Sequence, residues 1–231
     1  VAVADDLDRA YRHALAGDPR SAFGGVVALN RPLDSPTAAV LAQTFFEVLV
    51  APAFDPGALE ALSKRPKLRV LQPGPGPAIP PLEARPLSGG FLVQTADQAG
   101  HTLGEAKVVT QREPSQAEWK DLQFAWTVVK HVRSNGIVLA YQGAAVGVGA
   151  GQMSRVEAVE LAVKRAGSDA SGTVLASDGF FPYPDGVATA AAAGVRAIVQ
   201  PGGSLKDTEA IAAADAAGMA MVFTGERHFK H

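Results

Sequence analysis

With 231 residues, of which 47% are hydrophobic, the chain is long and apolar enough to form one large or two small packed domains. Its formal net charge of −2, without a strongly basic segment, argues against a nucleic-acid partner, because binding to phosphate backbones needs a dense positive surface. The absence of cysteine excludes disulfides, cysteine nucleophiles and thiolate zinc sites, and no run approaches the roughly 20 apolar residues that span a membrane.

Helices and short strands are predicted for the first third of the chain. The opening residues lack the basic start of a secretory signal, so we expect a cytoplasmic protein with no membrane partner. Apolar residues at three-to-four spacing indicate an amphipathic first helix, and Pro36 fits the first turn of a second one. The expected elements are helix 5–16, strand 24–30, helix 35–50, helix 56–63 and strand 68–71.

Residues 73–87 contain six prolines, which deny helix and central strand to that segment and predict a loop or linker. A short strand over 90–94 follows. We place a boundary between two subdomains, 1–110 and 111–231, in the segment around 98–113, and no sequence repeat relates them.

The second half alternates regularly between strand and helix patterns. The expected elements are helix 116–132, hairpin strands 137–141 and 145–149, helix 155–165, strand 172–176, helix 186–193, strand 197–199, helix 205–217 and strand 219–223. Gly194 and Gly218 fit the ends of two of these helices. Such alternation predicts an α/β fold with a mostly parallel sheet and helices on its faces.

A glycine-rich segment, 147–151, precedes the helix expected at 155. It fails the dinucleotide-binding fingerprint, because no glycine lies three residues after Gly149 or Gly151, and we interpret it as a tight connection between strand and helix. Ser154 and Glu157 have the spacing of a capping box. Arg155 would then lie in the first turn, where the helix dipole disfavours a cation, which suggests a functional role.

The loop 178–185 joins a strand to a helix and contains Phe180, Phe181 and Tyr183 among prolines. Loops at the carboxyl ends of strands bind ligands in open α/β sheets, so these rings could form a flat slot for a heteroaromatic ring. In the alternative interpretation the rings only cap the core, and Asp185 only caps the helix.

Two further segments have a functional and a structural interpretation. The backbone N–H groups of 200–204 could hold an anion or only form a turn before the next helix. The basic and aromatic residues 227–231 could be a solvated end, although the strand expected at 219–223 anchors them near the other strand-end loops.

Five separated motifs resemble those of the formyltransferase part of the bifunctional purine biosynthesis protein family. They are Ser21-Ala22-Phe23-Gly24-Gly25, Arg133-Ser134-Asn135-Gly136, Gly151-Gln152-Met153-Ser154-Arg155, Ser177-Asp178-Gly179-Phe180-Phe181-Pro182 and Arg227-His228-Phe229-Lys230-His231. That family transfers a formyl group from the cosubstrate 10-formyltetrahydrofolate to 5-aminoimidazole-4-carboxamide ribonucleotide (AICAR). The resemblance implies two related subdomains with a cytidine-deaminase-like fold, a homodimer with active sites at the subunit interface, and no zinc.

The resemblance also implies roles for individual residues. Asn135 would lie beside the reacting amide and formyl groups, and His231 would orient a catalytic histidine. Asp178, with the chain end, would lie near a structural potassium ion. The remaining residues implied in binding are Phe23 and Gly24 near folate and nucleotide, Glu47 at the aminoimidazole nucleotide, Ser154 and Arg155 at the carboxamide, Phe180, Pro182 and Asp185 around folate and base, and Arg227 and Phe229 at the phosphate and ribose.

The aminoimidazole amine is a poor nucleophile, so its proton must pass to a base while donors steady the oxyanion. In the family these tasks centre on a Lys-His pair followed by a Pro-Cys-Gly turn. The resemblance places that pair, and the cyclohydrolase domain, before Val1, so we expect a fragment with little activity alone. One alternative is a non-catalytic nucleotide-binding or dimerisation fragment of the same protein. Another, zinc-dependent nucleoside deamination, is opposed by the missing cysteine ligands.

Overall fold

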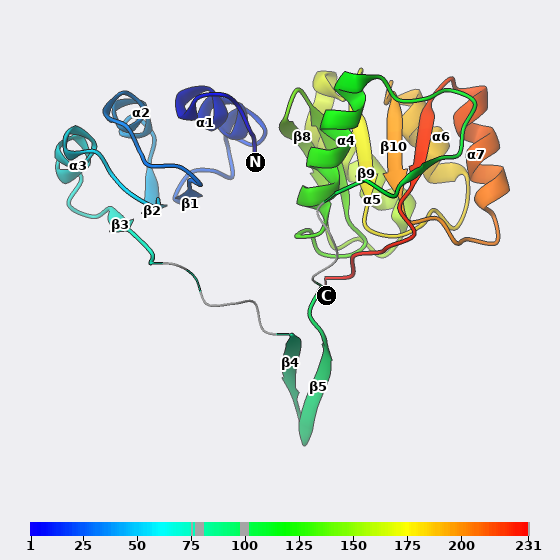
Figure 1. The fold of residues 1–231 in the computed structure, drawn as a ribbon, viewed down its shortest axis with the longest axis horizontal. Coiled ribbons are helices and arrows are strands. Elements are labelled where there is room, and N and C mark those ends of the chain that lie inside the picture. Colours follow the sequence, from blue (N-terminus) through cyan, green and yellow to red (C-terminus); the bar gives the residue numbers. More distant parts are fainter. Residues whose placement is uncertain (75, 77–80, 98–101, 231) are drawn as a thin grey trace.

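The computed structural model describes residues 1–74, 76, 81–97 and 102–230. Within these ranges the chain forms a three-stranded sheet, a two-stranded hairpin and a six-stranded sheet, which follow one another along the sequence (Figure 1). The α/β class with mixed sheets and flanking helices, expected from the sequence, is confirmed.

The first unit is a three-stranded parallel sheet with helices. The strands are β1 (Gly25–Ala28), β2 (Phe46–Val50) and β3 (Arg69–Leu71), and the helices are α1 (Leu7–Ala16), α2 (Ser35–Leu41) and α3 (Pro56–Ser63). Asp6 and Asp34 cap α1 and α2 by accepting backbone N–H bonds at 2.8 Å. Leu33, Leu41 and Leu49 are fully buried in the core that these elements share.

The helix expected over 35–50 is wrong in its second half, because α2 ends at Leu41 and β2 begins at Phe46. Phe46 to Val50 is rich in aromatic and β-branched residues, which favour a strand. Carbonyl groups at and just after the end of α2 accept hydrogen bonds from a residue outside the helix: Nη1 of Arg65 donates to the carbonyls of Leu41 and Thr44 at 3.4 and 2.5 Å.

A hairpin of β4 (Leu82–Leu87) and β5 (Gly90–Thr95) follows, with every residue of both strands exposed. The loop expected over 73–87 is therefore wrong for 82–87, and residues 75 and 77–80 of it lie outside the described residues. Pro86 is tolerated because a two-stranded ribbon has two outer edges, where a missing N–H breaks no ladder bond.

The second unit is a six-stranded mixed sheet in the order β6-β11-β10-β9-β7-β8. Its strands are β6 (Lys107–Val108), β7 (Ile137–Tyr141), β8 (Ala144–Gly149), β9 (Val174–Ser177), β10 (Ala197–Gln200) and β11 (Ala220–Phe223). The mostly parallel sheet expected from the sequence is wrong for this sheet as a whole: only the β9–β10 and β10–β11 pairs are parallel, and the other three neighbouring pairs are antiparallel. The two-residue strand β6 was not predicted and pairs antiparallel with β11. The division of the chain at residue 110 stays a prediction.

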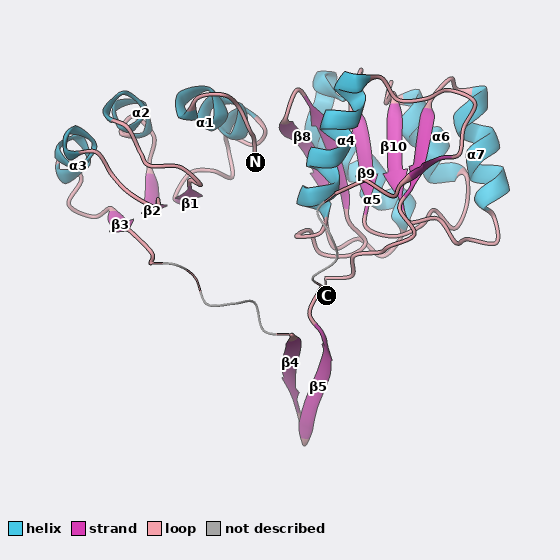
Figure 2. Cartoon of the chain, in the orientation of Figure 1, coloured by secondary structure: helices cyan, strands magenta, loops and turns pink. Residues whose placement is uncertain are grey.

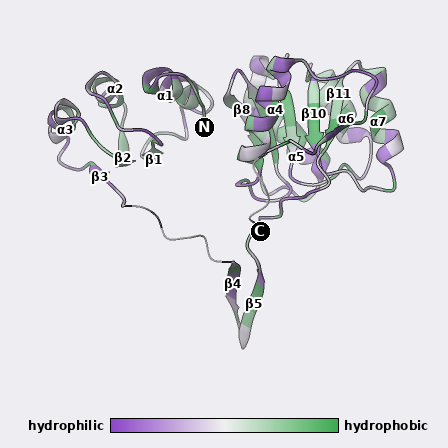
Figure 3. Ribbon diagram, viewed as in Figure 1, coloured by the Kyte–Doolittle hydropathy of each residue, from purple (hydrophilic) through white to green (hydrophobic). Residues whose placement is uncertain are grey.

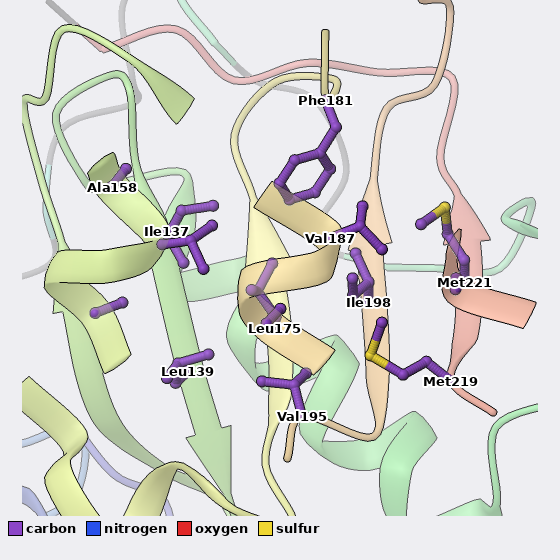
Figure 4. Packing of buried hydrophobic residues seen from close by; sticks show 14 of the residues in the cluster. Ile137, Leu139, Ala158, Leu175, Phe181, Val187, Val195, Ile198, Met219 and Met221 are labelled. Atoms are coloured by element: carbon purple, nitrogen blue, oxygen red, sulfur yellow. The ribbon is translucent and has the colours of Figure 1, made fainter. Parts of the chain in front are cut away.

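Helices cover both faces of this sheet: α4 (Gln116–Val129) on one, and α5 (Arg155–Ala166), α6 (Asp185–Ala192) and α7 (Asp207–Ala216) on the other (Figure 2). Alternate residues of each strand serve the two faces, so Val138 and Ala176 pack with Trp126 of α4, whereas Ile137 and Leu175 pack on the opposite side (Figure 4). The strands are correspondingly hydrophobic (Figure 3). No helix among the described residues is both long and apolar enough to cross a bilayer.

A capping box and an ion pair stabilise the start of α4. Ser115 and Glu118 form a capping box, and the Arg112 guanidinium binds the Glu118 carboxylate at 2.5 and 3.0 Å. The same Arg112 donates to the carbonyls of Arg196 and Gly218, so one side chain ties α4 to the turns before β10 and β11. Hydrogen bonding from Arg112 lowers the pKa of Glu118 from 4.5 to about 2.

Two glycines of β8 let α5 lie against the sheet. A Cβ at Gly147 would come within 2.2 Å of the Ala162 carbonyl oxygen, and one at Gly149 within 1.9 Å of that of Ala158. The glycines of 147–151 therefore serve helix-to-strand packing as well as the connection that the sequence predicted.

The two units meet along β8. Ala2 forms an antiparallel bridge with Ala144, and the Val3 N–H donates to the Gly143 carbonyl at 2.8 Å. Residues 1–3 thereby extend the edge of the six-stranded sheet.

Candidate functional site

A pocket of about 390 Å³ lies at one edge of the six-stranded sheet. Ile137 at the start of β7 is level with Gly149 at the end of β8 and with Ser177 at the end of β9, so the segments beyond these residues meet there. The pocket is lined by Asn135, Met153, Ser154, Arg155, Val156, Gly179, Phe180, Pro182, Tyr183, Asp185 and Phe229. The structure thus brings together seven residues that the resemblance implied, from four separate segments.

Arg155 is a buried cation at the base of this pocket, with 7% of its surface exposed. Its Nη1 donates to the Asp178 carboxylate and, at 3.0 Å, to Ser177 Oγ, while Nη2 donates to Asn135 Oδ1 at 2.8 Å. Asp178 is fully buried, and its charge compensates a cation that the dipole of α5 disfavours. The contact of Arg155 with a carboxamide stays a prediction.

Asn135 links the pocket to the turn before α5. Its Nδ2 donates to the carbonyls of Gln152 and Met153 at 2.9 and 3.2 Å. Ser154 begins α5 in a capping box with Glu157, as the sequence predicted. These bonds fix the two loops on either side of the β7–β8 hairpin in one arrangement, which is what a preorganised polar site requires.

The aromatic loop after β9 divides between core and pocket. Phe181 is fully buried and points into the core, where its N–H donates to Gln200 Oε1 at 3.1 Å (Figure 4). Phe180 and Tyr183 instead line the pocket and are 37% and 55% exposed. The interpretation that the rings cap the core is therefore confirmed for Phe181, whereas Phe180 and Tyr183 can form an apolar slot. Asp185 lines the pocket and also accepts the Gly186 N–H at the start of α6.

Residues 228–230 are held against the rest of the protein by backbone contacts, with His228 buried and Phe229 and Lys230 exposed. The Ser134 N–H donates to the Lys230 carbonyl at 2.9 Å, and Phe229 lines the pocket. The Arg227 guanidinium lies 4.9 Å from the centroid of the Phe229 ring, which places it beside the pocket without lining it. His231 lies outside the described residues, so its predicted role stays a prediction.

Phe23, Gly24 and Glu47 lie elsewhere, with the three-stranded sheet. The rings of Phe23 and Phe45 are 4.9 Å apart, and Glu47 lines a separate pocket of about 680 Å³ with residues 45–46 and 64–69. Within one chain the structure therefore does not join these residues to the pocket at the edge of the larger sheet.

Three lining residues were given no role of their own in the sequence analysis: Met153, Val156 and Gly179. Gly179 carries the clearest signal, because a Cβ there would lie 2.5 Å from Arg155 Nη2 and 3.2 Å from the Phe229 ring. A glycine between Asp178 and an aromatic pair could have indicated close packing at this point.

The segment 200–204 is a turn in this structure. The Gly203 N–H donates to Asp207 Oδ2 at 2.7 Å, and two acidic residues occupy the first turn of α7. An anion would meet negative charge there, so the structural interpretation is favoured.

Among the described residues, no cluster of three or more His, Cys, Asp or Glu side chains could hold a metal ion. Three buried side-chain oxygens have no hydrogen-bond partner within that part of the chain, and one of them, Oδ2 of Asp178, lies beside the pocket; the others are Tyr11 Oη and Asp207 Oδ1.

Comparison with known proteins gives one consistent result. A family model described as AICARFT/IMPCHase bienzyme matches residues 1–165. The whole chain is 52% identical over 231 residues to the bifunctional purine biosynthesis protein PurH of Synechococcus elongatus, 51% over 243 residues to that of Dinoroseobacter shibae and 53% over 238 residues to that of Sorangium cellulosum. It covers 45%, 46% and 45% of those proteins, so the chain spans less than half of their length.

Proposed function

Because the chain belongs to the AICARFT/IMPCHase bienzyme family, we propose that it binds AICAR and 10-formyltetrahydrofolate and serves formyl transfer in purine biosynthesis. The pocket at the edge of the larger sheet carries this proposal. It combines a fixed polar network around Arg155 and Asn135 with exposed rings of Phe180 and Tyr183. Its volume of about 390 Å³ falls in the range of small-molecule sites.

The chemistry of the ligands matches what surrounds the pocket. The aminoimidazole ring and the folate ring are flat and aromatic, and Phe180 and Tyr183 offer faces for stacking. Asn135 Oδ1 accepts from Arg155 and has a second lone pair for a carboxamide N–H, whereas the N–H groups of Asn135 and the hydroxyl of Ser154 already donate within the protein. Arg227 beside the pocket suits a phosphate, because a guanidinium presents forked donors to its oxygens.

In the proposed reaction the amine nitrogen of AICAR attacks the formyl carbon and forms a new C–N bond. The tetrahedral oxyanion then collapses, the bond from the formyl carbon to the folate nitrogen breaks, and that nitrogen gains a proton as the amine proton passes to a base. We assign the base to the family's Lys-His pair followed by Pro-Cys-Gly. The 231 residues contain Lys-His at 130–131, which is followed by Val-Arg-Ser and not by that turn, and at 230–231. Ligand binding is therefore proposed for this chain as it stands, and rapid transfer for a chain that includes the segment.

We also propose a homodimer whose sites combine residues of both copies. Phe23 and Glu47 lie apart from Asn135 in one chain, so a second copy is needed to bring the two groups together. The hairpin of β4 and β5 supports association, because an isolated two-stranded ribbon is marginally stable in water. Phe91 is 72% exposed there, which suits an interface and not a free surface.

Asp178 fits the proposed potassium ion in one respect. Its Oδ2 is buried and lacks a partner among the described residues, and a carboxylate oxygen is a ligand that a hard cation prefers. Higher unfolding midpoints in potassium chloride than in tetramethylammonium chloride at equal ionic strength would support an ion there. Equal midpoints for the unchanged protein would count against it.

Calorimetric titration with AICAR tests the binding proposal. We expect saturable binding by the unchanged chain and a loss of about five- to 150-fold in affinity for Phe180→Ala, since stacking of one base on an aromatic ring is worth about 1–3 kcal/mol. Leu205→Ala is the control, because Leu205 is fully exposed and does not line the pocket. Absence of AICAR binding by the folded, unchanged chain would refute the proposal.

Mixing two variants tests whether the sites are shared between copies. Glu47→Ala and Asn135→Ala each remove one side of the proposed composite site. If each site takes Glu47 from one copy and Asn135 from the other, mixed dimers regain one intact site, and about a quarter of all sites recover in an equal mixture. If both residues come from the same copy, mixing restores no tight binding.

A further inference from the structure

A buried histidine near the end of the chain is tied to a carboxylate from a distant segment. His228 is 1% exposed, and its Nδ1 lies 2.7 Å from Oδ2 of Asp97, which is 131 residues away in sequence. Asp97 follows closely on the end of β5 at Thr95. The pairing therefore joins the segment that leaves the hairpin to the last residues of the chain.

The surroundings of this pair come from α4 and the residue that follows it. The His228 ring packs on Trp126, with ring centroids 4.5 Å apart, and Lys130 Nζ lies 3.8 Å from Oδ1 of Asp97. Lys130 is 10% exposed, and Trp126 is buried. The imidazole thus has an aromatic face on one side and a carboxylate on its edge, a combination that allows few orientations of the ring.

The residues on either side of His228 belong to the candidate site. Arg227 and Phe229 are exposed while His228 is buried, the alternation of an extended segment with one side on the protein. The His228 N–H donates to the Asp178 carbonyl at 2.9 Å, which sets the segment directly beside the loop after β9. Phe229 then lines the pocket, and Arg227 stacks on Phe229.

We propose that His228, through its contact with Asp97, is a positioning residue that holds Arg227 and Phe229 at the candidate site. Residues 224–229 form no helix or strand, and such a segment opens easily unless buried contacts hold it. The Asp97 contact supplies such a hold, and neither Asp97 nor His228 lines the pocket. The consequence for ligands rests on the proposed function: with Arg227 fixed, the site distinguishes a nucleotide from the same nucleoside without phosphate.

Hydrogen exchange of residues 224–230 tests the hold without any ligand. We expect faster exchange in His228→Leu and in Asp97→Ala than in the unchanged chain. His228→Asn should retain slow exchange, because its side-chain amide can donate to Asp97 from nearly the place of Nδ1. His13→Leu is the matched control, since His13 lies on α1, away from the tail. Unchanged exchange in His228→Leu would overturn the proposal.

Affinity for AICAR and for its riboside, which lacks the phosphate, tests the link to the site. His228→Leu should lose about tenfold in AICAR affinity, the scale of one charge-assisted contact, with little change for the riboside. A general loss of structure would weaken both ligands alike and would overturn the positioning role, as would unchanged affinity for both despite faster exchange. The double variant with Asp97→Ala should lose no more than either single variant.

The two proposals can fail separately. If the unchanged chain binds neither ligand, the proposed function fails, and the exchange rates alone decide whether His228 holds the tail. If the unchanged chain binds AICAR, and His228→Leu has the same hydrogen-exchange rates and ligand affinities as the control His13→Leu, the proposed function stands and the role of His228 is refuted.

Discussion

Replacing Arg155 by methionine should destabilise the fold through Asp178. The Arg155 side chain is 7% exposed, and its removal leaves the fully buried Asp178 carboxylate without its cation. Breaking a buried, hydrogen-bonded ion pair in this way typically costs about 3–5 kcal/mol. That is a large part of the roughly 5–15 kcal/mol that stabilises a domain.

A second substitution, at Asp178, should restore part of the lost stability. In Arg155→Met combined with Asp178→Asn the buried charge is gone, so about 1–3 kcal/mol should return as a coupling between the two positions. Urea unfolding, followed by tryptophan fluorescence, gives the free energy of unfolding of each variant. The values are compared between variants whose unfolding free energies depend on urea concentration with the same slope. Arg12→Met is the control, because the Arg12–Asp8 pair lies at the surface and such pairs contribute about 1 kcal/mol at most.

Two results would refute this account of Arg155. One is a loss below about 1 kcal/mol for Arg155→Met, no larger than that of the surface control. The other is a double variant as unstable as the single one, which would show that the charge of Asp178 is not what Arg155 compensates.

Gly149→Ala should cost at least about 1–3 kcal/mol, because its Cβ would lie 1.9 Å from a carbonyl oxygen of α5; a midpoint equal to that of the unchanged protein would contradict the close packing. Glu118 has a pKa of about 2 when folded against 4.5 normally, chiefly because Arg112 hydrogen-bonds to it, so its charge stabilises the fold above pH 4.5 and that contribution disappears as the pH falls toward 2. The stability difference between the unchanged protein and Glu118→Gln should therefore shrink across this window, and a constant difference would count against the ion pair. Phe91→Ser with Val93→Ser, which replaces two exposed apolar residues of β5, should shift sedimentation toward monomer; a monomer before the change would refute the proposed dimer. Adding the family's Lys-His and Pro-Cys-Gly segment ahead of residue 1 should raise the rate of tetrahydrofolate release at saturating substrates by at least about several hundredfold. That increase falls within the roughly hundred- to ten-thousandfold contribution that is typical of positioned proton transfer. Equal rates with and without the segment would make His131 and His231 the candidate bases.

The sequence was most informative where local periodicity and the fold agree. From α5 to β11 the expected order of helices and strands is observed, because each element has its own period and is bounded by glycine or a cap. The pocket could be anticipated for the same reason, since its loops follow directly from strand ends. Seven of the residues that line the pocket were named from the resemblance, and the fold explains why they lie close together.

Failures occurred where distant residues decide local structure. The end of α2 at Leu41 depends on Arg65, which no periodicity in 35–50 reveals. Pro86 lies in a strand because that strand has a single partner, β5. The contact of His228 with Asp97 crosses 131 residues, and a lone histidine between two site residues gives no sign of it.

The bridge between residues 1–3 and 143–145 has a consequence for the order of folding. Hydrogen bonds join Val3 to Gly143 and Ala145 to Val1, so the first residues reach their native partners only after the β7–β8 hairpin has formed. During synthesis the three-stranded unit can pack its own core first, whereas residues 1–3 can pair with β8 only after that later strand has been synthesised. Because closing so long a loop is entropically unfavourable, we expect this seam to form late in refolding and to be the first contact between the units that opens under mild denaturant.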